Sequence, residues 1–474
     1  MEERVLKIKL LSYLFISSLS FSYLILPEKA GISVPIFVVV QFICLFFIVP
    51  NRKPLLIFIP IFILALNAFI SGNDIWRGSN FLLTIALYAL MVLMSNDDYE
   101  IGQSSAKFIL DIARNIFRPL AYFKVPVKWS RESNEARSRL MKRILIGFLV
   151  SIPCLVVIIV LLSSADEIFS RYIGQTFKIS QSFITPGSFF KLLCSLAAGF
   201  YLFGFAYLIH QPPNELVVKF DHKFGDFIII NIVLFSILSV YTIFTAIQFK
   251  YLFANSDALP YGLSYTYYAR RGFFELLFLS GVNIFIILLV LKLTREEKGL
   301  GARLTKYFCC CLCLITLILL ASSFYRMWLY NADSGLTRLR FLVFGFLIFE
   351  AVGLLFTFIY IIRPQFNIIV FYLLIGLSYY LLLNLIPMDA IIAKSQIDRY
   401  LANGKGDIEY VLTLSSDAAS QISRLSAGGN ARLKAEARKY FNRRNMEYER
   451  FSGWQKLNLS AEKCRRIYDH EKVR

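Results

Sequence analysis

Histidine and charged residues are scarce in this chain. Only 18% of its 474 residues are Asp, Glu, Lys or Arg, whereas a soluble domain has about 25%. The three histidines, His210, His222 and His470, are scattered, which argues against a histidine metal site. Seven of the eight cysteines lie in apolar stretches and Cys464 stands alone in the tail, so neither a disulfide framework nor a zinc spacing exists. We therefore expect no metal and no other cofactor.

The signatures of familiar enzyme classes are also missing. The sequence contains no Walker loop, no nucleophile elbow, no HExxH motif and no paired-cysteine site. These absences leave the known catalytic classes without support. They favour a function that does not depend on catalysis.

Long apolar stretches are what the chain has in abundance. Apolar residues make up 57% of it, with 45 Phe and 26 Tyr. They gather in blocks of roughly 18–24 residues, the length that crosses about 30 Å of hydrocarbon. Backbone N–H and C=O groups in lipid must be paired within their own segment, so such blocks form helices. We predict an all-α integral membrane protein with about eleven transmembrane spans, at 8–26, 31–49, 54–71, 78–94, 143–163, 189–209, 225–248, 272–291, 306–325, 339–362 and 366–386.

These blocks divide the chain into four parts. Residues 1–94 hold the first four spans and residues 95–142 form a basic loop. Residues 143–386 hold spans five to eleven, and residues 387–474 form a polar tail. The tail shows helical patterns separated by the glycine-containing stretches ANGKGD and SAGGN, which are typical of helix ends. We predict a small soluble helical module there.

The distribution of Lys and Arg predicts the orientation in the plasma membrane. With the N-terminus in the cytoplasm, 23 of the 51 basic residues fall on the inner side, 11 on the outer side and 17 in the tail. The excess on the inner side follows the positive-inside rule. An odd number of spans then places the tail outside the cytoplasm. The net charge of +19 is explained by anionic lipid, and we expect no nucleic-acid partner.

The basic loop contains one amphipathic pattern. Phe108, Ile109, Ile112, Ile116 and Phe117 share a helical face, and the basic side chains lie off it. One interpretation is a helix that lies on the inner membrane surface against anionic headgroups. The other is an ordinary connecting helix packed on the bundle.

Four polar, aromatic segments interrupt the apolar pattern at the ends of spans. They are LLSSADEIF (161–169), SYTYYARRGFFELL (264–277), RMWLYNADSGLTRLR (326–340) and NLIPMDAIIAKSQIDRYL (384–401). Ends of odd spans and starts of even spans lie on the same side of a membrane. The predicted topology therefore gathers all four segments on the outer face.

These segments resemble a bacterial family of multi-pass membrane proteins known as a domain of unknown function, the 4153/4173 type. The resemblance rests on Ser164-Ala165-Asp166, on Tyr268-Ala269-Arg270-Arg271-Gly272-Phe273, on Gly335-Leu336-Thr337-Arg338-Leu339-Arg340, and on Asn384, Asp389-Ala390 and Arg399-Tyr400. The tail stretches LSSDA (414–418) and WQKLNLS (454–460) are also similar, and the resemblance runs from about Arg143 to the end. Ser334 replaces a usual aromatic residue and Gln396 a usual asparagine. The resemblance implies a membrane protein and no established chemistry.

The predicted outer face provides a candidate polar cluster. Its arginines, clustered near helix ends, suit a phosphate or carboxylate ligand, and its carboxylates suit an internal network of ion pairs instead. The aromatic members fit an interfacial belt, and Glu275 is spaced to pair with Arg271. The candidate residues are Asp166, Tyr268, Arg270, Arg271, Glu275, Tyr330, Asp333, Arg338, Arg340, Asn384, Asp389 and Arg399.

Glu350 lies inside a predicted span, roughly 18 Å of helix away from Arg338. A carboxylate near the bilayer midplane costs about 2.5–3.5 kcal/mol on insertion scales. It either joins helices, with Asn231 or Asn283 as a partner, or it belongs to a proton or ion path.

Three functional hypotheses follow. The first is a non-enzymatic sensor or scaffold that recognises an envelope component or a partner protein with its outer face and tail. The second is a transporter that uses Glu350, although no inverted repeat is visible. The third is an envelope enzyme that holds a lipid-linked anion with the arginines.

Overall fold

The computed structural model describes residues 2–26, 29–95, 105–132, 186–211, 226–252, 273–294, 299–364, 367–426 and 430–473. Every element of secondary structure in these ranges is a helix. Within them, nine helices are long and apolar enough to cross a membrane. The prediction of an all-α multi-pass membrane protein is confirmed.

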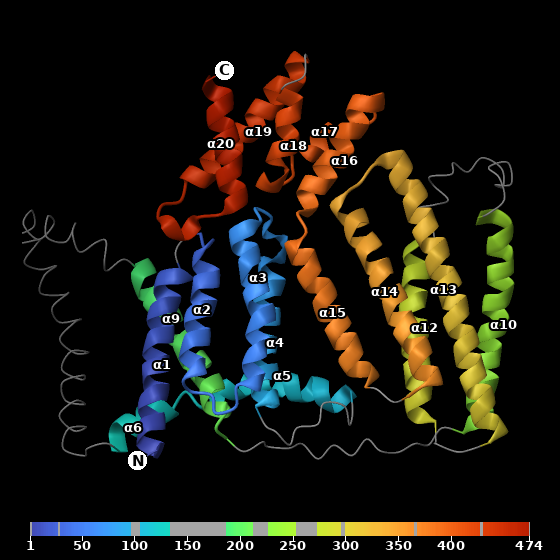
Figure 1. Ribbon diagram of the computed structural model, residues 1–474, viewed down its shortest axis with the longest axis horizontal. Helices are drawn as coiled ribbons and strands as arrows, with labels where there is room; N and C mark the ends of the chain where they lie inside the picture. Colours follow the sequence, from blue (N-terminus) through green and yellow to red (C-terminus); the bar gives the residue numbers. More distant parts are fainter. Residues whose placement is uncertain are drawn as a thin grey trace, which may run out of the picture.

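The membrane helices form two bundles side by side (Figure 1). The first bundle contains α1 (Glu2–Leu24), α2 (Ser33–Phe46), α3 (Phe58–Ile70), α4 (Arg77–Met94) and α9 (Pro186–Leu208). The second bundle contains α10 (Phe227–Leu252), α12 (Phe273–Leu293), α13 (Leu300–Ser334) and α14 (Arg338–Ile362). Between them, α15 (Ile368–Leu385) contacts α14 on one side and α3 on the other.

Each bundle has its own apolar core and an apolar outer surface. Leu45 and Ile61 are fully buried in the first bundle, and Ile287 and Leu312 in the second. Phe278 nevertheless leaves 74% of its surface exposed on the outside of α12. A water-soluble protein rarely exposes continuous apolar surface of this kind, whereas a bilayer accommodates it. The packing therefore agrees with a membrane-embedded protein.

Every predicted span has a corresponding helix except 143–163, which lies outside the described residues. The helix in the predicted span 31–49 is short, because α2 has 14 residues, about 21 Å of helix. The predicted span 306–325 is part of a longer helix. With 35 residues α13 extends about 52 Å, so its C-terminal turns continue beyond the predicted span.

The two prolines of the third span do not interrupt its helix. Pro54 lies in η1 (Lys53–Ile57), a short 3-10 helix, and Pro60 lies in the first turn of α3. The N–H groups of a first helical turn have no partner within the helix, so proline is tolerated there. A second short 3-10 helix, η2 (Asp74–Trp76), precedes α4 in the same way.

The predicted amphipathic helix is α5 (Ser105–Ala121), followed by α6 (Val125–Glu132). The helix α5 crosses the end of the first bundle that lies near the N-terminus (Figure 1), and it contacts α4 and α9. Phe108 is buried, whereas Ile109 and Phe117 are exposed. The apolar face is thus divided between the bundle and the outside. A contact between this helix and lipid headgroups stays a prediction.

The tail forms a helical module with a core of its own. Its elements are α16 (Met388–Asn403), α17 (Ile408–Val411), η4 (Ser416–Ala418), α18 (Ala419–Ser426), α19 (Ala431–Glu449), η5 (Trp454–Lys456) and α20 (Leu459–Val473). Ile392, Ile397, Val411 and Phe441 are buried in this core. Gly404 ends α16 in a left-handed conformation, with φ of 72°, as the glycine in ANGKGD predicts. The predicted helical tail is confirmed, and its character as a separate soluble module stays a prediction.

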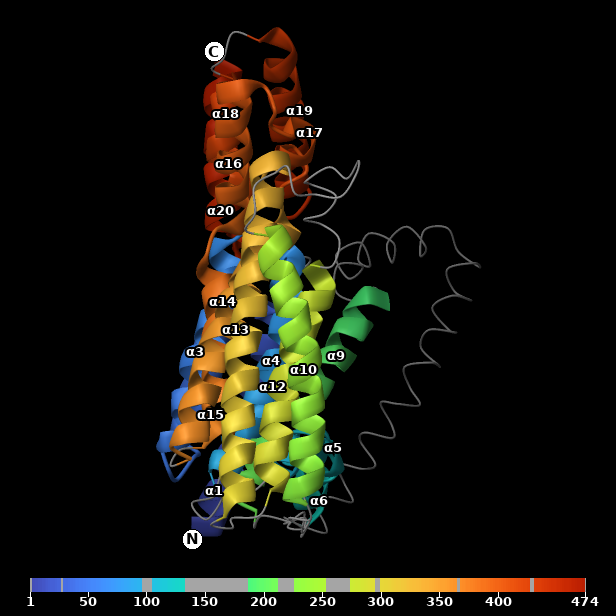
Figure 2. The same ribbon diagram turned by 90° about the vertical axis from the view of Figure 1, so that its right-hand side faces the viewer.

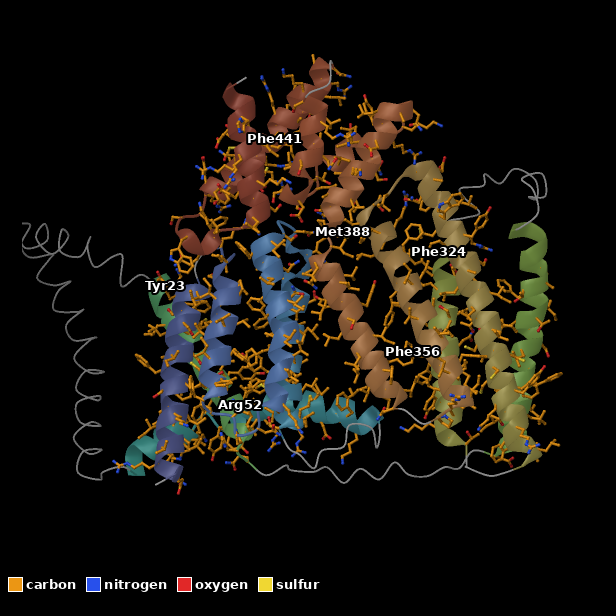
Figure 3. The ribbon with its side chains drawn as sticks, viewed as in Figure 1. Tyr23, Arg52, Phe324, Phe356, Met388 and Phe441 are labelled. Atoms are coloured by element: carbon orange, nitrogen blue, oxygen red, sulfur yellow. The ribbon has the colours of Figure 1, made fainter. Side chains whose placement is uncertain are left out.

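The module and the N-terminus lie at opposite ends of the bundles, and the perpendicular view agrees (Figures 1 and 2). Tyr23, near the module, and Arg52, at the other end, mark the two levels, and Met388 begins the module directly after α15 (Figure 3). The chain therefore crosses the bundle layer an odd number of times between them, as eleven spans require.

A membrane-impermeant thiol reagent tests this arrangement. Asn403 in α16 and Lys53 in η1 are both exposed, and they lie at opposite ends of the bundles. In a background without the eight native cysteines, Asn403→Cys and Lys53→Cys should show opposite labelling in intact cells, because the bilayer separates them. Permeabilised cells serve as the control, since both positions should react there. Equal labelling of both positions in intact cells contradicts the arrangement.

Candidate functional site at the junction of bundle and module

The junction begins with a tight turn between α13 and α14. Gly335 adopts φ of 76°, a region that favours glycine. A Cβ at this position would also lie 2.6 Å from the side-chain amide of Gln396 in the module. Thr337 then caps α14, because its side-chain oxygen accepts the backbone N–H of Arg340. The sequence Gly-Leu-Thr thus starts α14 at Arg338, whose side chain reaches Asp389 of the module.

Arg338 and Asp389 form a bidentate ion pair across the junction. The Nε and Nη2 atoms of Arg338 lie 2.7 and 2.5 Å from the two carboxylate oxygens of Asp389. The Asp389 side chain is fully buried and also accepts the backbone N–H of Ser415 at 2.9 Å. Burial acts to raise the pKa of the Asp389 carboxyl, but the hydrogen bonds from Arg338 and Ser415 outweigh it and hold the pKa below its usual range.

The other two described arginines of the cluster also bind groups of the protein. The Arg340 guanidinium lies 3.9 Å from the centre of the Tyr330 ring and donates to the carbonyl of Gly335. Arg399 donates to the carbonyls of Asn331 and Asp333 at the end of α13. Arg338 and Arg399 therefore connect α14 and the end of α13 to α16, whereas Arg340 holds the turn against α13. This is the geometry of an internal network.

Asn384, at the end of α15, connects the first bundle to the junction. Its side-chain oxygen accepts from the amide of Asn80 at 2.7 Å, and its carbonyl accepts from the amide of Asn67 at 2.9 Å. The hydroxyl of Tyr380 donates to the side-chain oxygen of Asn80 at 2.7 Å. All three asparagines are buried, so this network holds α15 against α3 and α4.

Further contacts bind the module to the loops of the first bundle. Asp417 accepts from the hydroxyl of Ser71 at 2.6 Å and from the N–H of Gly72 at 2.8 Å. Asn458 donates to the carbonyl of Ser71 at 2.7 Å. The N–H of Gly31 donates to the carbonyl of Gln455 at 2.7 Å. A Cβ at Gly31 would lie 2.3 Å from the Leu457 carbonyl, so glycine permits this approach.

Sequence reasoning assigned no role to these contacts. Asp417 and Asn458 lie inside the stretches LSSDA and WQKLNLS, which carried the resemblance, and Asn67 and Asn80 are polar residues within or beside apolar spans. A polar residue in an apolar run was the available signal. The structure adds the partner of each, which the sequence could not identify.

Several predicted site residues do not join the junction. Asp166, Tyr268, Arg270 and Arg271 lie outside the described residues, and the expected pair between Arg271 and Glu275 lies there with them. Glu275 itself is exposed near the start of α12. Within the described residues, no group of three or more His, Cys, Asp or Glu side chains is arranged to hold a metal ion.

Glu350 is separate from the junction and lies within the second bundle. It is 4% exposed, and the hydroxyl of Ser280 in α12 donates to it at 2.7 Å. The expectation of an asparagine partner was wrong. Asn283 instead bonds to Tyr241 and Thr316, and Asn231 bonds to Thr305 and the Gly301 carbonyl. The hydroxyl of Ser280 in α12 reaches Glu350 in α14. The position of Ser280 in an apolar run of the sequence did not indicate this contact.

Separating the partners of the junction ion pair should destabilise the protein. Arg338→Ala leaves the buried Asp389 carboxylate without its counter-ion, which costs roughly 3 kcal/mol. The double variant with Leu at both positions should lie closer to the parent, because it buries no unpaired charge. Thermal unfolding of the purified protein in detergent measures both differences.

The pH dependence of this loss separates an ion pair from packing alone. The Asp389 pKa is lowered, so the pair stabilises the fold above the ordinary carboxyl pKa of about 4. That contribution disappears as the pH falls through the lowered value. The difference in Tm between the parent and Asp389→Asn should therefore shrink below about pH 4. A constant difference at all pH values would show that charge plays no part.

Comparison with known proteins adds one match. No curated protein and no solved structure matches the chain. The family described as "Domain of unknown function (DUF4153)" matches residues 58–425. The match begins in α3, earlier than the first resembling motif, and ends in α18, before the stretch WQKLNLS. Because it covers more than three quarters of the chain, the protein belongs to the DUF4153 family.

Proposed function

We propose that this protein is a non-enzymatic sensor or scaffold of the plasma membrane, whose C-terminal module recognises an envelope component or a partner protein. The observation that carries the proposal is the buried Asp389 carboxylate, which receives Arg338 from the membrane bundle and the N–H of Ser415 from the module. A module mounted in this way can transmit a force or a binding event to α14, because the Asp389–Arg338 ion pair joins the two directly.

The orientation in this proposal has the module outside the cytoplasm. The support is the excess of basic residues on the side of the N-terminus. In the thiol-labelling experiment, this orientation requires that Asn403→Cys, and not Lys53→Cys, reacts in intact cells.

The module also has a groove suited to recognition. Its volume is about 690 Å³, within the usual range of about 300–1,000 Å³ for ligand sites. Tyr400 and Leu412 supply apolar lining, and Glu409 and Arg432 supply charges of both signs. A surface of this composition suits a partner with an apolar segment flanked by polar groups.

Photo-crosslinking in living cells tests the recognition role. A photoreactive amino acid replaces Glu409 or Arg432, both exposed in the groove, and Lys463, exposed on α20, serves as the matched control position. We expect discrete crosslinked products from the two groove positions and none from position 463. The absence of products from the groove, or the same products from all three positions, contradicts the proposal.

A transporter that uses Glu350 is the second candidate. The observation that favours it is the burial of this carboxyl against Ser280 in the second bundle. Asn283, about one turn further along α12, bonds to Tyr241 of α10 and Thr316 of α13. Buried polar groups on neighbouring helices are the usual material of a proton or ion path.

Flux measurements in liposomes test the transporter. Glu350→Gln keeps the shape of the side chain and removes the carboxylate, so proton or solute flux should fall to the level of empty liposomes. Glu275→Gln, which changes an exposed carboxyl near the start of α12, is the control and should retain the flux of the parent. Absence of flux in the parent, or equal flux in Glu350→Gln, eliminates this candidate.

A further inference from the structure

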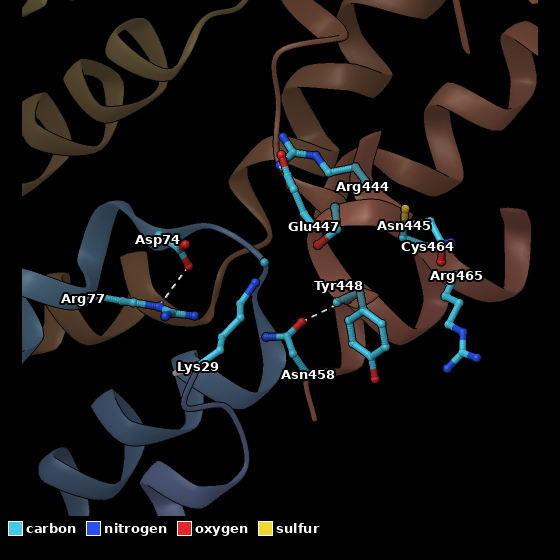
Figure 4. A pocket seen from close by; sticks show the side chains of 13 residues that line it. Lys29, Asp74, Arg77, Arg444, Asn445, Glu447, Tyr448, Asn458, Cys464 and Arg465 are labelled. Atoms are coloured by element: carbon cyan, nitrogen blue, oxygen red, sulfur yellow. Dashed lines mark hydrogen bonds and ion pairs between the residues drawn. The ribbon is translucent and has the colours of Figure 1, made fainter. Parts of the chain in front are cut away.

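A small polar cavity lies between the module and the loops of the first bundle (Figure 4). Its volume is about 70 Å³, and an enclosed water needs roughly 10–15 Å³. The cavity therefore has room for a group of a few non-hydrogen atoms. It is lined by Lys29 from the α1–α2 loop, by Asp74 and Arg77 before and at the start of α4, and by Arg444, Glu447 and Arg465 from the module.

The charges around this cavity do not balance. Four of the six charged side chains are cations, and the two carboxylates are already paired. Asp74 lies 2.9 Å from Arg77, and Glu447 lies 2.7 Å from Arg444. Lys29 and Arg465 have no carboxylate within ion-pair distance among the described residues. Lys29 thus extends into the cavity without a counter-ion, whereas the guanidinium of the exposed Arg465 is directed away from Lys29 (Figure 4).

The environment of Lys29 is unfavourable for its charge. The side chain is directed into the cavity from the bundle side, with Arg77 beside it and Glu447 across from it (Figure 4). Burial lowers the pKa of Lys29; Arg77 and Arg444 act in the same direction, and Asp74 and Glu447 oppose them. An anion in the cavity would relieve this cost.

Unpaired hydrogen-bonding groups at the cavity also indicate a bound ligand. The Nε–H of Arg444 is buried and has no acceptor in the described part of the chain, and the side-chain oxygen of Asn445 is buried without a donor. Buried polar groups are nearly always satisfied in proteins, so orphans of this kind call for a ligand or water. A phosphate group supplies acceptor oxygens and, when it carries a proton, a donor as well.

We propose that this cavity binds a phosphate group, either as free phosphate or as the headgroup of an anionic phospholipid. The site lies where α1 and α3 end and α4 begins, at the level of lipid headgroups for helices that cross a bilayer. A bound phosphate would accept from Lys29 of the bundle and from the unpaired Nε–H of Arg444 of the module, and so would brace one against the other. This site goes beyond the proposed recognition role and does not depend on the groove.

Thermal unfolding of the purified protein in detergent tests the site. Inorganic phosphate and, separately, short-chain phosphatidylglycerol are titrated at constant ionic strength, with chloride as the reference salt. Each should raise the Tm of the parent if it reaches the site. Lys29→Gln should weaken this response by about tenfold, because it removes a charge-assisted contact. Lys463→Gln removes a cation that is exposed on α20 outside the cavity, and this variant should respond as the parent does.

The two titrations distinguish the sources of phosphate. A response to phosphatidylglycerol alone identifies a lipid headgroup, and a response to inorganic phosphate identifies the free ion. No response to either, or an unchanged response in Lys29→Gln, overturns the site. Unliganded variants with the Tm of the parent show that folding is intact. Because the crosslinking in the groove does not involve Lys29, failure of this site is separable from failure of the recognition role.

Discussion

One buried ion pair, between Arg338 and Asp389, governs how the two halves of this protein meet. Its carboxylate has no exposure to water, so it needs the bidentate arginine and the Ser415 N–H to offset the loss of hydration. These partners come from α14 and from the loop before η4, while Asp389 itself begins α16. Three segments must therefore take up one relative placement, and the turn at Gly335 and the cap at Thr337 serve that placement.

The motifs of the resemblance that lie in the described part of the chain gain a common physical meaning from this arrangement. Gly335 and Thr337 shape the turn, and Asp389 and Arg399 hold it to α16. The stretches LSSDA and WQKLNLS supply Asp417 and Asn458, which bind the α3–α4 loop. Each of these motifs is a contact of the junction. The docking of the module is therefore the part of the architecture that these sequence features encode, whatever ligand the module recognises.

Two polar levels with different properties result. At the junction, arginines and carboxylates bind one another and backbone carbonyls, so this level is well suited to rigidity. Inside the second bundle, Glu350 has the neutral Ser280 as its partner. The free-energy cost of burying Glu350 therefore depends on whether its carboxyl group is protonated. The cavity beside Lys29 is intermediate, since it holds a cation without a counter-ion at the edge of the interface.

The sequence by itself determined the class of the protein, most of its spans and the helical module, because length and hydrophobicity decide whether a segment crosses lipid and Gly404 decides where α16 ends. It also singled out Arg338, Asp389 and Glu350, since charges next to or inside apolar runs are costly and conspicuous. Only the tertiary structure decided the partners. These include the pairing of Arg338 with Asp389, the contact of Glu350 with Ser280 rather than an asparagine, and the short length of α2. They follow from contacts between segments far apart in the chain, and no local pattern of the sequence records those contacts.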